Sequence, residues 1–240
     1  MKTQMSRRPE QFVSRDVWNR EYASIKAIPS STREQPAKAL VLFADLLGFS
    51  NGARVLDAGC GNGRNSVFLA QRGCRVTAVD FSEEAVNETK RRARLAGQER
   101  EIDVLESFID DPLPLAVGTI DGVIDCYTFC HFLEAEAGNG FWKEISRVTR
   151  PGGQILSVVF SPEDEYYAQF TSGAEVRGKI VTDPSNGISK RLYTEREIKN
   201  YLSEFFRYRF FATFEFTDIV QRKEYRRVVL ISVMQTFESR

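Results

Sequence analysis

A glycine-rich turn between a short apolar segment and a helix is the feature that most constrains this chain. It lies in the run VLDAGCGNGRNSVFLA, residues 55–70. Asp57 ends the apolar segment, and Gly59, Gly61 and Gly63 alternate before the predicted helix. Glycines in such a turn let the backbone bend sharply and approach a ligand closely. The pattern therefore predicts a βα turn that binds a ligand.

Two other glycine-rich loops that bind phosphates do not fit this turn. In the dinucleotide pattern GxGxxG counted from Gly59, the third glycine would fall on position 64, which is Arg64. Asp57 would also lie beside the pyrophosphate, which a carboxylate repels. No Gly-Lys-Ser/Thr follows the turn, so a Walker loop is excluded. The turn favours a ligand with a cationic group near Asp57.

A second acid follows the next predicted strand. Asp80 comes directly after RVTAV, residues 75–79, and a carboxylate there can accept both ribose hydroxyls of a nucleoside. With Asp57 and the three glycines, it indicates a nucleoside that carries an amino-acid tail. The alternative is a tight turn with caps and no ligand, which the coincidence of three glycines and two strand-end acids disfavours.

Strands and helices alternate along the middle of the chain. The predicted strands are residues 53–57, 75–79, 101–105, 120–125 and 154–160. The predicted helices between them lie near residues 63–72, 83–96 and 139–149. The strands start about 20 to 35 residues apart, which is typical of βα units in a parallel sheet. Residues 207–216 and 226–234 predict a terminal antiparallel pair.

We expect one domain over residues 1–240, with an N-terminal helical cap in residues 1–48. The cap is predicted to hold two helices, 9–27 and 36–48. Apolar residues make up 42% of the chain and charged residues 28%, which is ordinary globular usage and argues against a disordered or coiled-coil chain.

Residues 161–206 contain no obvious parallel strand, so we interpret 161–192 as a substrate-cap insert that leads into a helix at 194–205. Three aromatic side chains in the insert could close on an acceptor: Tyr166, Tyr167 and Phe170. Three basic side chains could meet a carboxylate or phosphate: Arg177, Lys179 and Arg191. The alternative is a solvated surface excursion.

The charges balance at 33 basic and 33 acidic residues, which argues against a protein that coats nucleic acid. A local basic patch stays open, and we interpret QRKEYRR, residues 221–227, as a solvated hairpin turn. The four cysteines form no CxxC pair, so neither a zinc site nor a disulfide framework is expected. With no apolar run of 18 residues and no signal-peptide core, we expect a cytoplasmic protein without a membrane partner.

Four stretches resemble the class I S-adenosylmethionine-dependent methyltransferases: VLDAGCGNG (55–63), VTAVDFS (76–82), IDGVIDCYTFCHFL (120–133) and RVTRPGGQIL (147–156). They come in the order and spacing of that family and cover about residues 40–160. The run 59–80 is most similar to the small-molecule branch that includes tellurite-resistance and thiopurine-type methyltransferases. The resemblance implies an α/β, Rossmann-like fold with helices on both faces of a seven-stranded, mostly parallel sheet. The last strand of this sheet is antiparallel, and strands six and seven pair in antiparallel fashion at one edge.

The resemblance also implies S-adenosylmethionine as the cofactor, lying over the carboxyl ends of the first strands. The methionine part is then assigned to the turn, with Asp57, Ala58, Gly59, Cys60, Gly61 and Gly63. Asp80 is assigned to the ribose. The adenine is assigned to Phe81, Ser107 and Phe108, although the acid usual there stands one place earlier, as Glu106. Asp125 and Cys126 follow the fourth strand, where the backbone of the family meets the methionine end.

Acceptor-side residues are predicted near the end of the fourth strand and on the first helix. His131, the one histidine of the chain, has an ordinary pKa of about 6.5 and could act as a base; the alternative is a packing histidine. Tyr127 could line the acceptor pocket, whereas Cys130 is interpreted as a buried, apolar side chain. Trp18 and Tyr22 are four apart on one helix face, where they could attract a sulfonium or simply dock the helix.

The predicted function is methyl transfer to a small-molecule acceptor by a monomer or homodimer, with no nucleic-acid partner and no metal. After the fourth strand stands DCYTF rather than the Asn-Pro-Pro-Tyr motif of amino-methylating DNA enzymes. One alternative is non-methylating chemistry, in which the cofactor itself is cyclised or cleaved, as in azetidine-carboxylate synthases. The motifs would look the same because they only bind the cofactor. A non-catalytic binding module is disfavoured by the intact turn and Asp80.

Overall fold

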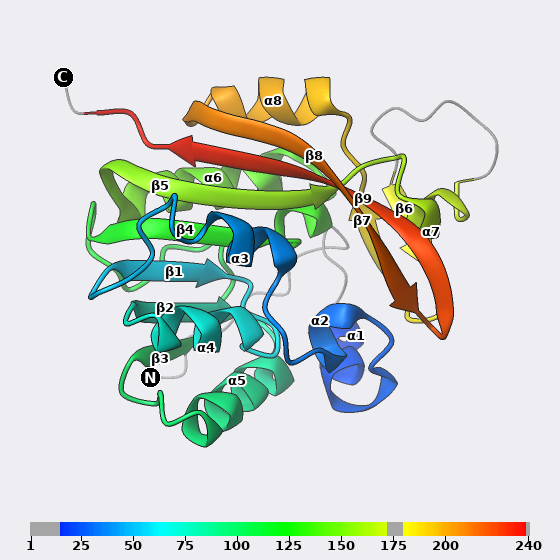
Figure 1. Ribbon diagram of the computed structural model, residues 1–240, viewed down its shortest axis with the longest axis horizontal. Helices are drawn as coiled ribbons and strands as arrows, with labels where there is room; N and C mark the ends of the chain where they lie inside the picture. The colour runs from blue at the N-terminus through cyan, green and yellow to red at the C-terminus, as the bar shows by residue number, and fades with distance from the viewer. Residues whose placement is uncertain (1–14, 172–179, 239–240) are drawn as a thin grey trace.

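A seven-stranded sheet forms the centre of the molecule (Figure 1). The computed structural model describes residues 15–171 and 180–238. The strands are β1 (Arg54–Ala58), β2 (Arg75–Asp80), β3 (Ile102–Glu106), β4 (Ile120–Cys126), β5 (Thr149–Phe160), β8 (Arg207–Val220) and β9 (Lys223–Gln235), in the order β3-β2-β1-β4-β5-β9-β8. Strands β1 to β5 are parallel, and β9 runs antiparallel to both β5 and β8. The predicted fold class is confirmed.

The parallel strands end at one edge of the sheet, which is where the two strand-end acids meet. Apolar residues bury β1 and β2 on both faces, as expected for strands covered by helices on either side. In the register, Asp57 pairs with Ala78, and Asp80 pairs with Glu106 at the end of β3. The glycine turn and Asp80 therefore lie side by side at the carboxyl edge.

Helices cover both faces of the sheet. They are α3 (Lys38–Phe43), α4 (Arg64–Gln71), α5 (Glu83–Leu95), α6 (Ala135–Val148) and α8 (Glu195–Ser203). Helix α3 lies over one face of the central strands and α6 over the other (Figure 1). The Ser82 side chain accepts a hydrogen bond from Ala85 N and so caps α5, as its sequence position favours. The core between the layers includes the fully buried Trp142 and Phe129.

The N-terminal cap lies at the carboxyl edge of the sheet (Figure 1). It consists of α1 (Arg15–Arg20), the π-helical turn η1 (Glu21–Ile25) and α2 (Pro29–Thr32). The buried Glu21 carboxylate accepts hydrogen bonds from Ile28 N at 2.9 Å and from Ser31 Oγ at 2.6 Å, which ties α1 to the segment after it. The predicted helix at 9–27 is thus shorter at its C-terminal end, and residues 9–14 lie outside the described residues.

The predicted insert folds against the same edge. It contains α7 (Glu165–Ala168) and a separate two-stranded antiparallel sheet, β6 (Ile180–Asp183) and β7 (Ile188–Arg191). The described part of residues 161–206 holds no parallel strand, as predicted. Arg177 and Lys179 lie outside the described residues.

The β8–β9 hairpin is longer than the sequence predicts and extends past the sheet towards the N-terminal cap (Figure 1). Its two-residue turn is formed by Gln221 and Arg222, whose φ angles of 50° and 67° suit a tight hairpin turn. The turn predicted over residues 221–227 is confirmed only at its first two residues, because residues 223–227 already belong to β9. The extension brings the far half of the hairpin over the carboxyl edge.

Candidate active site

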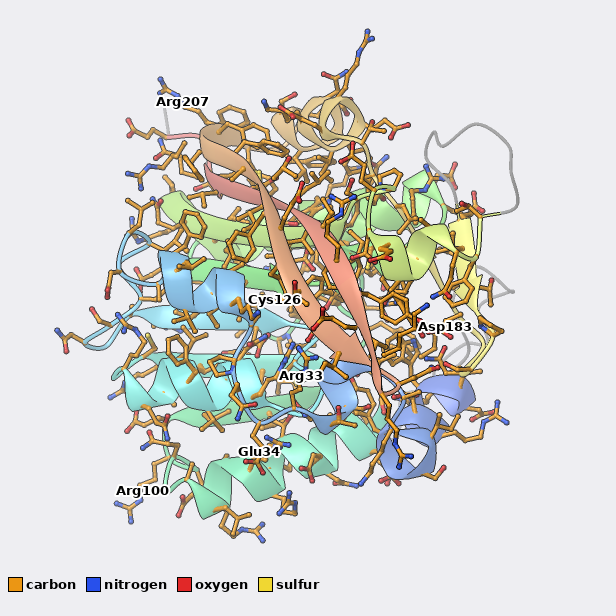
Figure 2. All side chains as sticks on the ribbon, turned by 45° about the vertical axis from the view of Figure 1, so that its right-hand side comes forward. Arg33, Glu34, Arg100, Cys126, Asp183 and Arg207 are labelled. Atoms are coloured by element: carbon orange, nitrogen blue, oxygen red, sulfur yellow. The ribbon has the colours of Figure 1, made fainter. Side chains whose placement is uncertain are left out.

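A cavity of about 380 Å³ opens at the carboxyl edge of the sheet. The glycine turn, the ends of β2 and β4, the N-terminal cap, the insert and the β8–β9 hairpin all contribute to its lining. In Figure 2, the labelled Cys126 and Arg33 lie near the hairpin, and Asp183 lies on its other side in the insert. Segments far apart in the sequence thus enclose one space.

The glycine turn is packed so closely that side chains at two positions would collide with neighbours. A Cβ atom at Gly59 would lie 2.2 Å from Thr128 Oγ1, and one at Gly61 would lie 2.6 Å from Tyr22 Oη. Both glycines also have positive φ angles, 79° and 56°. Only glycine meets both conditions, so the backbone itself forms the wall of the cavity here.

Asp57 lies buried beneath the turn, with one carboxylate oxygen left over. Its Oδ2 accepts a hydrogen bond from Ser66 Oγ at 2.6 Å, whereas Oδ1 is buried and has no hydrogen-bond partner among the described residues. Burial raises the pKa of Asp57 to about 7. A cationic group in the cavity would favour the ionised form of this carboxyl.

Asp80 is held rigidly at the end of β2. Its Oδ2 accepts a hydrogen bond from Gly61 N at 3.0 Å, and its Oδ1 accepts one from Ser82 N at 2.9 Å. Burial raises the pKa of Asp80 to about 6, while these backbone donors oppose the shift. The carboxylate is therefore mostly ionised at pH 7, and each oxygen keeps a lone pair for a further donor such as a ribose hydroxyl.

An aromatic pair stands beside Asp80. The rings of Phe81 and Phe108 stack with centroids 5.2 Å apart and an interplanar angle of 20°. Arg15 of the N-terminal cap donates from Nε to the Phe81 carbonyl at 2.6 Å and from Nη2 to Glu106 at 2.8 Å. Glu106 is thus held in an ion pair with Arg15, and the flat faces of Phe81 and Phe108 offer stacking surface for a base.

His131 and the N-terminal cap meet at the other side of the cavity. The Trp18 ring contacts the His131 ring edge-on at 4.8 Å and stacks on Tyr22 at 5.9 Å, so the predicted shared helix face is confirmed. His131 Nδ1 lies 2.9 Å from the Ser189 carbonyl and therefore donates to it, which leaves Nε2 as an acceptor. Burial, with the nearby Lys190, lowers the pKa of His131 to about 3.

The lowered pKa disfavours His131 as a base near neutral pH, and its role in catalysis stays a prediction. The reason is that Trp18 and β7 enclose part of the ring, so its protonated form is disfavoured. A neutral imidazole with so low a pKa is a weak proton acceptor. His131 still lines the cavity, so a contact with the acceptor stays a prediction.

Tyr127 has a left-handed backbone, with φ at 72°, and its ring stacks on Phe160 at 4.7 Å. Positive φ is unusual for a bulky residue and is found preferentially at functional sites. Cys130 is fully buried, its thiol donates to the Tyr127 carbonyl, and burial raises its pKa to about 12. The interpretation of Cys130 as an inert, buried side chain is confirmed.

Most of the predicted site residues do line the cavity: Trp18, Tyr22, Gly59, Cys60, Gly61, Asp80, Phe81, Ser107, Phe108, Cys126, Tyr127 and His131. Four others lie behind this lining: Asp57, Ala58, Gly63 and Asp125. Asp125 accepts hydrogen bonds from Thr128 N, Phe129 N and Ser157 Oγ, so its carboxylate holds the loop that follows β4. Gly63 begins α4 against Thr89.

Five cations that line the cavity were missed in the sequence: Arg33, Lys38, Arg64, Lys190 and Arg227. Arg64 directly follows the glycine turn, and this position in the sequence could have indicated that it lines the cavity. Arg227 contradicts the interpretation of 221–227 as wholly solvated, because it is 2% exposed and pairs with Asp164 at 2.8 Å. The described residues contain no group of His, Cys, Asp or Glu side chains suited to a metal ion.

Residues 55–153 match the model of a family described as methyltransferase domain. A crystal structure of the Burkholderia thailandensis 1,6-didemethyltoxoflavin-N1-methyltransferase, with bound 1,6-didemethyltoxoflavin and S-adenosylhomocysteine, is similar with a TM-score of 0.68 and 21% identity. That similarity covers 93% of this chain and 87% of the other. The chain has the class I methyltransferase fold.

Two curated relatives add to this methyltransferase similarity. The demethylmenaquinone methyltransferase of Beutenbergia cavernae is 37% identical over 121 residues, 49% of this chain and 45% of that protein. The tRNA (carboxymethyluridine(34)-5-O)-methyltransferase ALKBH8 of Mus musculus is 30% identical over 164 residues, 67% of this chain. The chain spans 22% of the length of the second relative, less than half in either case. The tellurite-resistance and thiopurine-type branch stays a prediction.

No helix in the described parts of the chain is both long and apolar enough to cross a bilayer.

Proposed function

We propose that this chain transfers the methyl group of S-adenosylmethionine to a small-molecule acceptor. The observation that carries the proposal is the single cavity, which joins the glycine turn and Asp80 to the aromatic residues around Tyr127. S-adenosylmethionine is the cofactor, and when bound it supplies an electrophilic methyl group on a sulfonium. The domain match over residues 55–153 supports this assignment.

The residues present fit that cofactor. The unpartnered Asp57 Oδ1 under the turn suits an ammonium group, and the fixed Asp80 carboxylate suits a pair of ribose hydroxyls. The stacked Phe81 and Phe108 suit an adenine. Arg64 is buried in the lining, and its Nη1 donates to the Gln35 carbonyl at 3.2 Å, so a cation is also available for a carboxylate.

The residues of this chain contribute positioning and exclusion of water. Trp18, Tyr22 and His131 form an aromatic wall supplied by the cap and the loop after β4. Such a wall attracts a cationic centre and orients an acceptor against it, which lowers the barrier to a displacement without a dedicated base. The low pKa of His131, about 3, agrees with that mode of catalysis.

A nucleic-acid acceptor is the second candidate, because the ALKBH8 relative acts on tRNA according to its name. The small-molecule reading is favoured by the cavity volume of about 380 Å³, which lies in the range of small-ligand sites. The insert and the hairpin also border the cavity, through Tyr167 and Arg227, which limits the room for a large acceptor.

Methyl transfer is tested by incubating the full chain with S-adenosylmethionine labelled in its methyl group. The incubations contain a library of planar small molecules, unmodified tRNA, or no acceptor. Label transferred to a small molecule, with matching release of S-adenosylhomocysteine, supports the proposal. Label found only on tRNA would favour the second candidate. Conversion of the cofactor without any acceptor would identify the non-methylating chemistry instead.

A further inference from the structure

Two cations are buried in the cavity where Phe160 and Tyr167 border it. Lys190 of β7 is 3% exposed and Arg227 of β9 is 2% exposed. Lys190 Nζ lies 4.0 Å from the centroid of the Tyr167 ring, and Arg227 Cζ lies 5.2 Å from it. Both cations line the cavity, although they come from segments about 37 positions apart in the sequence.

Lys190 has no carboxylate directly against it. Its Nζ donates to Tyr167 Oη at 2.6 Å, and no described residue forms an ion pair with it. Asp183, the nearest acid in its own hairpin, accepts from Tyr166 Oη at 2.7 Å and from Ser185 Oγ. An ammonium carries three donors, so two remain for a ligand.

The charges around Lys190 only partly offset its burial. Burial lowers its pKa to about 8; the carboxylates of Asp183 and Asp164 raise it, and Arg227 lowers it. An ammonium that is buried without a counter-ion gains most from an anion in the same cavity.

Arg227 also keeps one donor nitrogen for a ligand. Its Nε donates to Asp164 at 2.8 Å, and its Nη1 lies 3.8 Å from Asp218. Asp218 is itself held by Arg33 at 2.5 Å. Nη2 of Arg227 is buried and has no hydrogen-bond partner among the described residues. A buried N–H without a partner costs free energy that an incoming acceptor atom would recover.

The walls between these cations are flat aromatic rings. Tyr127 and Phe160 stack with an interplanar angle of 18°, and Tyr167 meets Phe160 edge-on with centroids 4.7 Å apart. These stacked and edge-on rings favour a planar ligand. Lys190, which has no carboxylate in contact, disfavours a sulfonium at this end by like-charge repulsion, so we assign this end to the acceptor rather than to the cofactor.

We propose that the acceptor is a planar aromatic or conjugated molecule whose anionic oxygen, a carboxylate or an ionised hydroxyl, binds Lys190 Nζ and Arg227 Nη2. This inference rests on the proposed function, since it names the acceptor class of that same site. It goes beyond that function because it assigns the charge and shape of the substrate to two named side chains.

The test is calorimetric binding of matched planar probes to the full chain saturated with S-adenosylhomocysteine. We expect 2-naphthoate to bind at least about tenfold more tightly than its neutral isostere 2-naphthamide. In a second arm, 4-nitrophenol is titrated spectroscopically, because a site that prefers the ionised hydroxyl lowers its apparent pKa on binding. Tighter binding of 2-naphthoate than of 2-naphthamide identifies a carboxylate as the anionic group of the acceptor. A lowered pKa of bound 4-nitrophenol identifies an ionised hydroxyl.

Variants assign the preference to the two cations. In Lys190→Met the preference for 2-naphthoate falls below about threefold, while the matched Lys143→Met, on the exposed side of α6, keeps it. Arg227→Gln is expected to weaken the anion similarly. If that variant does not fold, because Asp164 is left unpaired, Lys190→Met decides alone. Affinity for S-adenosylhomocysteine should stay within about twofold of wild type in Lys190→Met.

Three results would overturn the inference. The first is equal binding of 2-naphthoate and 2-naphthamide without a shift in the pKa of 4-nitrophenol. The others are binding of none of the probes and an unchanged preference for 2-naphthoate in Lys190→Met. Failure of the proposed function would give a different result, because the wild-type protein would then not bind S-adenosylhomocysteine. In that case the probe comparison is made on the protein alone, so the two failures are distinguished.

Discussion

Tyr22 covers Gly61: the tyrosine hydroxyl oxygen lies 2.6 Å from the place where a Cβ atom on that glycine would stand. The contact joins the N-terminal cap to the centre of the glycine turn, two segments about 39 positions apart in the sequence. The position of the N-terminal cap therefore affects how closely the turn is covered.

The first prediction follows from that contact. Gly61→Ala should destabilise the protein by about 1–2 kcal/mol through its left-handed backbone alone, and by more through the collision with Tyr22. Adding Tyr22→Ala should relieve the collision and leave the backbone cost. A double-mutant cycle in chemical denaturation measures the coupling. Strictly additive effects would show that Tyr22 does not press on the turn in solution.

The second prediction concerns the ribose contact. Asp80→Asn should weaken binding of S-adenosylhomocysteine by about 1.5–3 kcal/mol, since a neutral amide accepts more weakly than a carboxylate. Asp103→Asn, on the exposed side of β3, is the matched control and should bind like wild type. Isothermal calorimetry compares the two. Equal affinities would remove Asp80 from the cofactor site.

The third prediction is a pH dependence of cofactor affinity. The pKa of Asp57 is raised to about 7 and that of Asp80 to about 6, and both carboxyls are expected to bind donors in their ionised forms. Affinity for S-adenosylhomocysteine should therefore rise from pH 5 to pH 8, by about tenfold or more. Asp57→Asn should flatten the upper part of this curve. A flat profile in wild type would contradict the assignment of both carboxyls.

The fourth prediction is the opposite trend for the stability of the protein without cofactor. Burial raises the pKa values of Asp57, Asp80 and Asp125, the last also to about 6. Between about pH 4, where carboxyls titrate in unfolded chains, and pH 7, the folded state holds more protons than the unfolded state. The free energy of unfolding should then fall as pH rises through this window. Urea titrations at pH 5 and pH 8 measure it.

The fifth prediction concerns the cap and the insert as a lid. Trp18→Ala should lower turnover about tenfold without unfolding the protein, because the aromatic wall at His131 is lost, whereas Asp16→Ala on the exposed side of α1 should not. Hydrogen exchange should show residues 15–25 and 161–171 becoming protected when S-adenosylhomocysteine is added. Protection confined to 55–63 and 80–82 would show that the lid does not close.

The cofactor side of the cavity could be predicted from the sequence because its determinants are local. Asp57, Gly59 and Gly61 lie within one turn, and Asp80 follows the neighbouring strand. Parallel strands end at a common edge, so strand-end residues meet without further information. The alternation of strands and helices predicted the parallel part of the sheet, whereas its antiparallel last strand was implied by the resemblance to the methyltransferases.

The acceptor side could not be predicted because its chemistry depends on burial. Lys190 and Arg227 stand in polar segments that are indistinguishable from solvated turns by composition. They become part of the cavity only because β7 and the far half of β9 fold over its edge. The same burial removes the neutral-pH titration of His131, which the residue type alone suggested.

The position of β9 has a consequence for the order in which the molecule is completed. Although β9 is the last strand of the described residues, it lies inside the sheet, between β5 and β8. During synthesis on the ribosome, β5 and β8 must each wait with an unpaired edge until residues 223–235 emerge. Arg227 arrives with that strand. The nascent chain can thus assemble its glycine turn early, but the opposite wall of the cavity forms only after residues 223–235 have emerged.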